Sequence, residues 1–265
     1  MFLSHCFSQD TICDFCNFMK QRILRLFLDR TSYGCAAKEI LAWSRSAESR
    51  YVCAANVHMV MEAWDSPSFQ DVVNSADMVT PDGMPLVWML RLKGEKEQER
   101  VYGPTLMLHV LEAAERENIS VGFYGSDAQT LEKLVKRMQA QYPRLTVGFS
   151  YSPPFRALTP AEDEQLIQQI QESDVRILFV ALGCPKQEIW MAAHRGKIPA
   201  VMLGVGAAFD FHAGTVKQAP AWMQRLGLEW FFRFTQEPAR LWKRYLYHNP
   251  RFVILAIWEL VRKNA

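Results

Sequence analysis

Three short stretches combine residue types that could do chemistry with the pattern of a strand ending in a turn. Thr80-Pro-Asp-Gly83 puts a carboxylate in a tight turn, Gly183-Cys-Pro-Lys-Gln-Glu188 brings a lysine, an amide and a second carboxylate, and Gly204 to Gly214 contains Asp210. In an open parallel sheet such turns meet where strands end, and unpaired backbone N–H groups and helix dipoles there attract negative charge. The pattern therefore indicates a site for an anion, and we favour a nucleotide.

Asp82 is the residue that could act as a general base. A turn after a strand holds its carboxylate rigidly and half exposed, as abstraction of a proton from a bound hydroxyl requires. The alternative is that Asp82 only caps the apolar helix that follows, because Pro-Asp-Gly is itself a common turn sequence. The residue types alone leave both interpretations open.

The second stretch has the composition of a phosphate-binding helix start. Free N–H groups there can hold a phosphate, Lys186 can neutralise it, and Gln187 or Glu188 can hydrogen-bond a base or a sugar. The alternative is an ordinary polar first turn. The pair Gly204-x-Gly206 lacks the third glycine of a dinucleotide fingerprint and no acidic residue follows at the expected distance, which disfavours a nicotinamide enzyme.

Several classes of site are not supported. There is no Asp-x-Asp after a strand, so we expect cations and helix ends, without a metal ion or another cofactor, to meet any pyrophosphate. Walker, Gly-x-Ser-x-Gly and His-Glu-x-x-His motifs are also absent from the sequence. His212 is the one histidine we would test, with a structural role as the alternative. Cys13 and Cys16 could form a zinc or redox site, or simply belong to an N-terminal extension.

The bulk composition bounds the class of protein. A chain of 265 residues with 49% hydrophobic content can bury one substantial core. Its apolar run from Phe252 to Trp258 is far shorter than the ~20 residues that a membrane-spanning helix needs. No signal peptide is visible and six cysteines fit reduced thiols, so we expect a cytoplasmic protein. We expect no nucleic-acid partner and leave a homo-oligomer open.

From about residue 36 the hydrophobic pattern alternates helices with strands. Unbroken apolar strands between amphipathic helices predict a Rossmann-like α/β fold, a parallel sheet with helices on both faces. The pattern predicts helices at 36–46, 84–92, 104–117, 127–141, 160–172 and 185–194, a further helix that Pro67 opens, and strands at 51–55, 119–124, 145–149, 176–182 and 200–205.

The composition changes after Pro220. Residues 222–265 contain four of the eight tryptophans and eight basic residues against three acidic ones, so they carry a net charge of +5. We therefore divide the chain into an N-terminal extension (1–27), a Rossmann-like catalytic domain (28–220) and a C-terminal membrane-associating appendage (221–265).

Residues 239–249 of the appendage predict an amphipathic helix bracketed by Pro238 and Pro250. On a helical wheel, one side carries basic residues and the other is apolar. Such a helix suits the surface of an anionic membrane. The alternative is a helix packed on the main domain with solvated charges. The basic side holds Arg240, Lys243, Arg244 and Tyr247; the apolar side holds Leu241, Trp242, Tyr245 and Leu246.

Taken together, these residues resemble the WecG/TagA/CpsF family, glycosyltransferase family 26, over roughly residues 28–250. The resemblance implies an inverting, metal-independent transferase that moves a sugar from a UDP-sugar to an undecaprenyl-diphosphate-linked saccharide at the cytoplasmic face of the membrane. It rests on Asn56, Pro81-Asp-Gly83, Arg100-Val-Tyr-Gly103, Gly183-x-Pro-Lys-Gln-Glu188, Gly204-Val-Gly206, Phe209-Asp210, Gly214-x-Val-Lys217, Ala219-Pro220, Leu228-Glu-Trp-x-x-Arg233 and Glu237-Pro238.

The resemblance also implies roles for individual residues. Asp82 resembles the base that deprotonates the acceptor hydroxyl, and Arg233, with Arg240 behind it, resembles the arginines expected to meet a diphosphate. These cations would stabilise the leaving group without a metal ion. The other residues expected to bind substrate are Asn56, Arg100, Gly103, Lys186, Gln187, Glu188, Gly206 and Asp210.

The sequence departs from the family pattern near the site. A Thr-Pro pair common before the family's Asn is Ala54-Ala55 here, and the frequent Gly-x-Asp-Leu is Gly103-Pro-Thr-Leu106. The family has been associated with transfer of N-acetylmannosamine, glucose and glucuronate, so the sugar stays open. The sequences of residues 84–88 and 102–105 are closer to exopolysaccharide members than to teichoic-acid members. A sugar-nucleotide-binding scaffold without catalysis and a UDP-sugar hydrolase are the alternatives.

Overall fold

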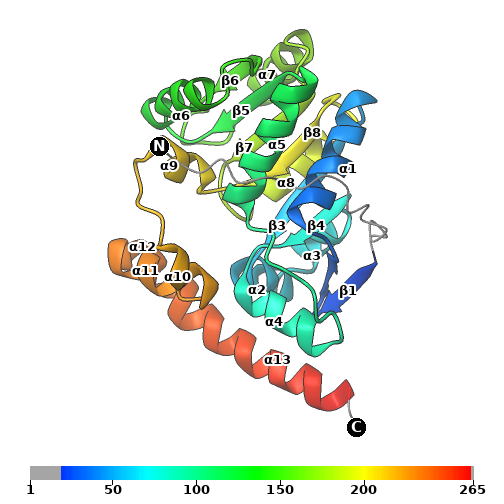
Figure 1. Ribbon diagram of the computed structural model, residues 1–265, viewed down its shortest axis with the longest axis vertical. Coiled ribbons are helices and arrows are strands. Elements are labelled where there is room, and N and C mark those ends of the chain that lie inside the picture. Colours follow the sequence, from blue (N-terminus) through cyan, green and yellow to red (C-terminus); the bar gives the residue numbers. More distant parts are fainter. Residues whose placement is uncertain (1–18, 264–265) are drawn as a thin grey trace, which may run out of the picture.

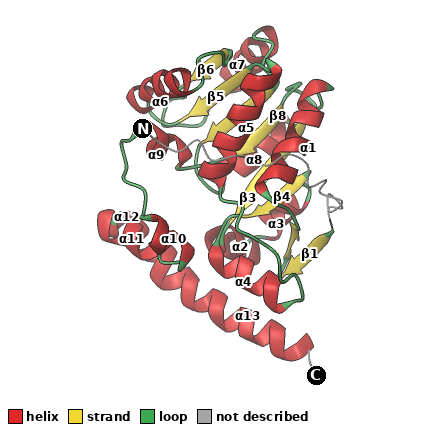
Figure 2. Cartoon of the chain, viewed as in Figure 1, coloured by secondary structure: helices red, strands yellow, loops and turns green. Residues whose placement is uncertain are grey.

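A six-stranded parallel sheet with helices on both faces forms the centre of the computed structural model, which describes residues 19–263 (Figures 1 and 2). This confirms the predicted α/β class. The strands run in the order β4-β3-β8-β7-β5-β6, and their bounds are β3 (Arg50–Ala55), β4 (Met78–Pro81), β5 (Val121–Gly125), β6 (Val147–Tyr151), β7 (Ile177–Ala181) and β8 (Val201–Gly204).

The central strands are apolar because helices cover both of their faces. Every residue of β8 is buried, and in β7 only the last residue is partly exposed. Phe123 of β5 stacks on Phe179 of β7 with ring centroids 5.6 Å apart. Loss of either ring would leave a cavity at the middle of the sheet.

The helices form two layers, each with its own apolar cluster. One layer holds α1 (Tyr33–Arg45), α5 (Gly103–Glu117), α6 (Ala128–Gln141) and α9 (Ala208–Ala213); the other holds α2 (Val57–Asp65), α3 (Pro67–Asn74), α7 (Pro160–Glu172) and α8 (Lys186–His194). The chain leaves β3 toward α2 and leaves the neighbouring strand β8 toward α9, on the opposite face. A crevice for a ligand is expected at such a switch point.

An antiparallel hairpin of β1 (Lys20–Ile23) and β2 (Leu26–Asp29) precedes the sheet. Ile23, Leu26 and Leu28 are fully buried in the main core, and the Asp29 carboxylate accepts a 2.7 Å hydrogen bond from the N–H of Val79 in β4. The predicted boundary between residues 27 and 28 therefore cuts through β2. Residues 20–27 pack with the sheet, while Cys13 and Cys16 lie outside the described residues.

Helix α2 was not predicted, whereas α4 (Met84–Leu92) and α7 have the predicted limits. The side chain of Asn56 caps α2 by accepting a hydrogen bond from the N–H of Met59 at 3.3 Å. An N-cap asparagine satisfies one of the free N–H groups of a first turn. Asn56 thus fixes where α2 begins, directly after β3.

The appendage consists of α10 (Ala221–Arg225), α11 (Glu229–Gln236), α12 (Pro238–Trp242), a π-helix η1 (Lys243–His248) and α13 (Asn249–Lys263). Figure 1 shows it in orange and red, running past α2 and α4 after an extended link from α9. Pro250 was expected to end a helix, but the helix continues through it into α13. A proline ring clashes with the carbonyl one turn earlier, and the wider π-turn just before Pro250 makes room for it.

The side chains that face inward in this part of the appendage differ from those predicted. Leu241, Tyr245 and His248 are buried, whereas Trp242 and Leu246, predicted on the same apolar side as Leu241, are exposed. The buried residues keep the i, i+4, i+7 spacing of one helical face, but that face is narrower than predicted and is centred on Leu241 and His248. The predicted division into two faces is therefore wrong for this segment. None of the helices between residues 19 and 263 is long and apolar enough to cross a membrane.

Helix α13 is attached to the hairpin and to α4 by a buried ion pair. Lys93 Nζ lies 2.6 Å from Glu259 Oε1, with side chains that are 3% and 13% exposed. Glu259 Oε2 also accepts a 2.8 Å hydrogen bond from the N–H of Leu24 in the turn between β1 and β2. One carboxylate of α13 thus joins three elements.

Replacing Glu259 with alanine should lower the free energy of unfolding by about 3 kcal/mol, because it leaves the buried Lys93 ammonium without its partner. Urea denaturation followed by circular dichroism measures the change. Glu132→Ala, which breaks an exposed pair with Lys136, is the control and should have a much smaller effect. Equal effects of the two substitutions would show that the Glu259 pair does not hold α13.

Candidate active site

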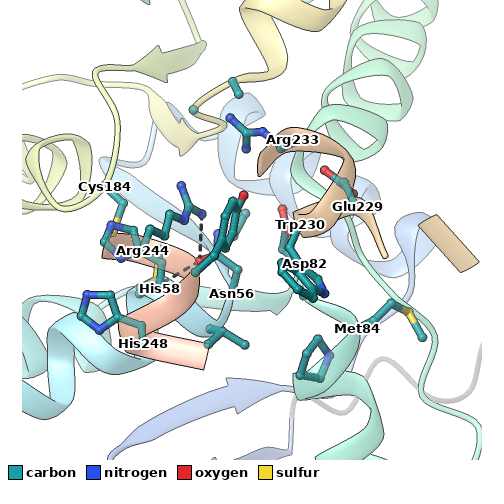
Figure 3. A pocket seen from close by; sticks show the side chains of 18 of the residues that line it. Asn56, His58, Asp82, Met84, Cys184, Glu229, Trp230, Arg233, Arg244 and His248 are labelled. Atoms are coloured by element: carbon teal, nitrogen blue, oxygen red, sulfur yellow. Dashed lines mark hydrogen bonds between the residues drawn. The ribbon is translucent and has the colours of Figure 1, made fainter. Parts of the chain in front are cut away.

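One cavity of about 1120 Å³ lies between the carboxyl ends of the sheet strands and the appendage (Figure 3). The loops that follow β3, β4, β5, β7 and β8 line one side of it, and α11, α12, η1 and α13 line the other. The register aligns Ala55 of β3 with Pro81 of β4, so Asn56 and Asp82 emerge side by side. The main unit and the appendage therefore build the cavity together.

Asp82 is held in position by backbone groups and faces the cavity. Its N–H donates to the carbonyl of Ala55 at 2.9 Å, and its Oδ2 accepts from the N–H of Gly103 at 2.9 Å. Its other oxygen, Oδ1, lies 3.6 Å from Nη2 of Arg100, which is too long for a hydrogen bond. Among the described residues Oδ1 has no hydrogen-bond partner, so it can accept a proton from a bound molecule.

The pKa of the Asp82 carboxyl is raised to about 6, and burial is the main cause. The positive charge of Arg100 and the hydrogen bond from Gly103 act in the opposite direction, while the negative charge of Glu229 raises the pKa further. The side chain is only 13% exposed, which agrees with a large desolvation effect. Near neutral pH the group is ionised but is more basic than an ordinary aspartate.

Glu229, at the start of α11, binds two residues of the main unit. Its carboxylate accepts hydrogen bonds from Arg100 Nη2 at 2.8 Å and from the hydroxyl of Tyr102 at 2.7 Å. The guanidinium of Arg100 also stacks on the ring of Tyr102, 3.9 Å from its centroid, and donates from Nε to the backbone carbonyl of Asp82. Arg100 thus connects Asp82 to the appendage.

Four cationic residues of the appendage line the cavity, namely Arg233, Arg240, Lys243 and Arg244. Nε of Arg233 is buried and has no hydrogen-bond partner among the described residues, and its guanidinium lies 5.6 Å from the ring of Phe211. Arg244 Nη2 donates to Asn56 Oδ1 at 3.4 Å. Arg244, predicted on the membrane-facing side, instead points into the cavity (Figure 3). Such a group of cations suits a diphosphate.

The structure brings most of the predicted site residues to this cavity. The residues that line it are Asn56, Asp82, Arg100, Gln187, Gly206, Asp210, Arg233 and Arg240. Burial raises the pKa of Asp210, and the charges of Arg240 and Arg233 counter that effect. Gly206 has φ +52°, a conformation that glycine adopts without strain. These residues form the polar end of the cavity.

Three predicted residues do not line the cavity. Lys186 is exposed, and Glu188 is fully buried, with its Oε1 bound to Gln187 Nε2 at 2.7 Å and its pKa raised to about 7 by burial. Gly103 contributes its N–H to Asp82, and a Cβ there would lie 3.3 Å from Asp82 Oδ2. His212, at 2.9 Å from the carbonyl of Pro104, has a structural contact and does not line the cavity.

The opposite end of the cavity is apolar. It lies between α4 and α13 and is lined by Trp88, Met89, Leu92, Phe252, Val253, Ala256, Ile257 and Leu260. Several of these side chains are also open to solvent, among them Trp88 at 44% and Leu92 at 70% exposed. An elongated apolar group could leave the polar end along this route.

Sequence reasoning missed Glu229 and Tyr102, although both belong to stretches that it singled out. No clear signal marked Glu229, because an acidic residue in the first turn of a helix is common. It also missed His58, Glu62 and His248, which line the cavity from α2 and η1. Burial and the charge of Arg244 lower the pKa of His58 to about 3. Without α2 in the prediction, no pattern could place His58 near η1.

Comparisons with known proteins point to one group of enzymes. A sequence profile described as "Glycosyl transferase WecG/TagA/CpsF family" matches residues 21–265. A protein of Bacillus spizizenii is 32% identical over 204 residues, 77% of each chain, and a protein of Bacillus subtilis is 31% identical over 216 residues, 81% of each chain. Both carry the name N-acetylglucosaminyldiphosphoundecaprenol N-acetyl-beta-D-mannosaminyltransferase.

Asp82→Asn should stabilise the fold at neutral pH. The folded-state pKa near 6 exceeds the ordinary value of 3.8, so the folded form holds the proton more tightly, and wild-type stability falls as pH rises from about 4 to 6. Asparagine avoids this loss of stability, and its side-chain oxygen can still accept a hydrogen bond from the N–H of Gly103. The variant should therefore gain about 2 to 3 kcal/mol at pH 7.5 and almost nothing at pH 4.

Urea titrations of both proteins at several pH values measure this difference, with Asp174→Asn at an exposed position as the matched control. A stability difference between Asp82→Asn and the wild type that does not change with pH would contradict the raised pKa.

Proposed function

Because this chain belongs to the WecG/TagA/CpsF family of glycosyl transferases, we propose that it transfers a sugar from a UDP-sugar to an undecaprenyl-diphosphate-linked saccharide. The observation that carries the proposal is the position of Asp82. Asp82, whose Oδ1 has no hydrogen-bond partner among the described residues, lines a cavity that has a polar end, several arginines and an apolar exit. One cavity thus offers a place for each part of both substrates.

The donor nucleotide is assigned to the polar end, over the loops after β5, β7 and β8. Gly183, Gly204 and Gly206 line this part and let a ligand approach the backbone closely. Gln187 holds the β7–α8 loop by accepting from the N–H of Gly183 at 3.2 Å. Asp127 and Asp210, which also line the cavity, are the carboxylates available to the hydroxyl groups of the donor.

In the proposed reaction the acceptor hydroxyl gives its proton to Asp82 Oδ1 as its oxygen attacks the anomeric carbon. The bond from that carbon to the UDP oxygen breaks on the opposite side, so the configuration inverts and one base is sufficient. A pKa near 6 suits this role, because the group is ionised at neutral pH yet basic enough to take the proton. Gly103 keeps the carboxylate oriented through Oδ2.

The arginines of the appendage are proposed to stabilise the diphosphate that leaves. Arg233, Arg240 and Arg244 line the cavity from α11, α12 and η1, so a charge that develops on the leaving oxygen would meet preorganised donors. The unpartnered Nε of Arg233 is the strongest support, since a buried guanidinium nitrogen normally has a hydrogen bond. These cations would serve the transfer itself without a metal ion.

The polyprenyl part of the acceptor is assigned to the apolar end between α4 and α13. Helix α13 also presents an exposed apolar stripe at helical spacing, made of Val253, Ile254, Ile257, Trp258 and Val261. With the appendage's net charge of +5 this supports a site on the inner, anionic face of the cytoplasmic membrane. The enzyme would take its acceptor from the bilayer while it binds a water-soluble donor.

The donor sugar is proposed from the relatives. Both are named N-acetylmannosaminyl transferases with an N-acetylglucosamine-diphosphate-lipid acceptor, which favours UDP-N-acetylmannosamine as the first donor to test. A role of this enzyme in exopolysaccharide biosynthesis stays a prediction from the sequence. A donor panel with UDP-glucose and UDP-glucuronate separates these possibilities.

Purified protein should transfer a sugar from one donor of the panel to a short-chain diphosphate-linked N-acetylglucosamine acceptor. Mass spectrometry of the acceptor measures the transfer.

Asp82→Asn should retain UDP binding but lose turnover by about 100-fold or more, because the general base is gone. For the wild type, kcat/KM should rise with pH to about 6 and then level off, since only the ionised carboxylate accepts the proton.

The exposed Asp174→Asn variant is the control for this assay. UDP release without transfer to the lipid would identify a hydrolase. UDP binding without consumption of any donor in the panel would identify a scaffold. Full turnover of Asp82→Asn would remove Asp82 from the role of base.

Ile254→Ser with Val261→Ser should weaken binding to anionic liposomes by tenfold or more. Both side chains lie on the exposed stripe of α13 and outside the cavity, and loss of their burial costs about 1.5 kcal/mol or more. Liposome co-sedimentation measures the effect, with exposed Ile189→Ser on α8 as the control. Unchanged binding of the double variant would indicate that α13 is not the membrane-facing element.

A further inference from the structure

Two imidazoles and one carboxylate converge where η1 crosses α2. His58 and Glu62 lie one turn apart on α2 and so share a face of that helix. His248, the last residue of η1, approaches the same carboxylate from the appendage. His58 Nδ1 lies 3.6 Å and His248 Nε2 lies 3.5 Å from Glu62 Oε1. Figure 3 shows the two histidines side by side.

These distances are too long for good hydrogen bonds. They instead match the edge of a coordination tetrahedron, because two ligand atoms at zinc-to-ligand distances near 2.05 Å lie about 3.4 Å apart. One ligand atom from each of the three residues can be chosen so that all lie within 4.8 Å of one another. The ring centroids of His58 and His248 are 5.5 Å apart, close to the ~5 Å expected for two imidazoles on one zinc ion.

The surroundings of the cluster also fit metal ligation. His58 Nδ1 is buried without a hydrogen-bond partner among the described residues, so the atom that faces Glu62 is free to bind a metal ion. The backbone of Cys184 hydrogen-bonds the His58 ring. A ring held by a backbone group is the usual outer contact of a metal-binding histidine. The side chain of His248 is only 7% exposed.

We propose that His58, Glu62 and His248 bind a zinc ion that joins the appendage to α2. Two imidazoles and a carboxylate form a ligand set that binds zinc in preference to magnesium or calcium. The three residues also line the cavity, so a fourth coordination position is open to water. The joint would fix η1, and with it Arg244, above the ends of the strands.

His248 shares the inward face of this segment with Leu241 and Tyr245, because the three residues are spaced i, i+4 and i+7 and all are buried. Single π-turns such as η1 also frequently accompany functional sites. The proposed zinc is a structural joint, and the proposed transfer, in which Asp82 and the arginines act, does not involve it. The nearby positive charge of Arg244 opposes a cation and should limit its affinity.

The experiment uses full-length, untagged protein in which Cys13 and Cys16 are serine, so that the N-terminal cysteines cannot bind zinc. Equilibrium dialysis at micromolar free zinc followed by elemental analysis should find one zinc per chain. Cobalt in its place should give the intense visible absorption of a tetrahedral site. Chelation should lower the thermal midpoint, and zinc but not magnesium should restore it.

Glu62→Gln and His248→Asn should each weaken zinc binding by tenfold or more, because loss of even an outer contact costs about that much. His109→Asn, which alters a histidine stacked on Tyr33 outside the cavity, should bind as the parent does. Arg244→Gln should bind zinc more tightly, an effect that adventitious surface binding would not show. Absence of zinc from the parent, or zinc affinity in Glu62→Gln and His248→Asn that equals the parent's, would overturn the proposal.

Discussion

The buried carboxylate of Glu229 is the interaction on which the architecture of the site depends. It takes one hydrogen bond from Arg100 and one from Tyr102, so it attaches the first long helix of the appendage to the loop that also contacts Asp82. Removing one partner of such a buried ionic group leaves an uncompensated charge, which is strongly unfavourable. This contact therefore helps to hold α11 over the carboxyl ends of the strands, where the appendage lines the cavity.

The same contact adjusts the chemistry of Asp82. Arg100 is 2.8 Å from Glu229 but 3.6 Å from Asp82, so the nearest cation is engaged mainly by the other carboxylate. A direct pair with Arg100 would keep the pKa of Asp82 low and make it a poor base. Burial is the main cause of the raised pKa of Asp82, and the negative charge of Glu229 raises it further. The environment of Asp82 thus destabilises its ionised form, and this makes the carboxylate more basic.

Much of this fold could be predicted from the sequence, and the failures have physical causes. Apolar strands between amphipathic helices indicated the parallel sheet, and the limits of α4 and α7 were correct because proline marks both helix starts. Asp82 lines the cavity as predicted, because a strand and a turn bracket it; its role as a base stays a prediction. Arg244 was misplaced because a helical wheel shows which residues share a face but not which face packs against the rest of the protein. Lys186 was misplaced because a helix start does not reveal which of its side chains face a ligand.

A crystal structure of the protein with UDP and a short-chain diphosphate-linked acceptor would test the central claim most directly. The account predicts both ligands in the one cavity, with the acceptor hydroxyl within hydrogen-bond distance of Asp82 Oδ1. It also places a diphosphate against Arg233, and the lipid between α4 and α13. An acceptor bound outside this cavity, or a hydroxyl that Asp82 does not reach, would contradict it.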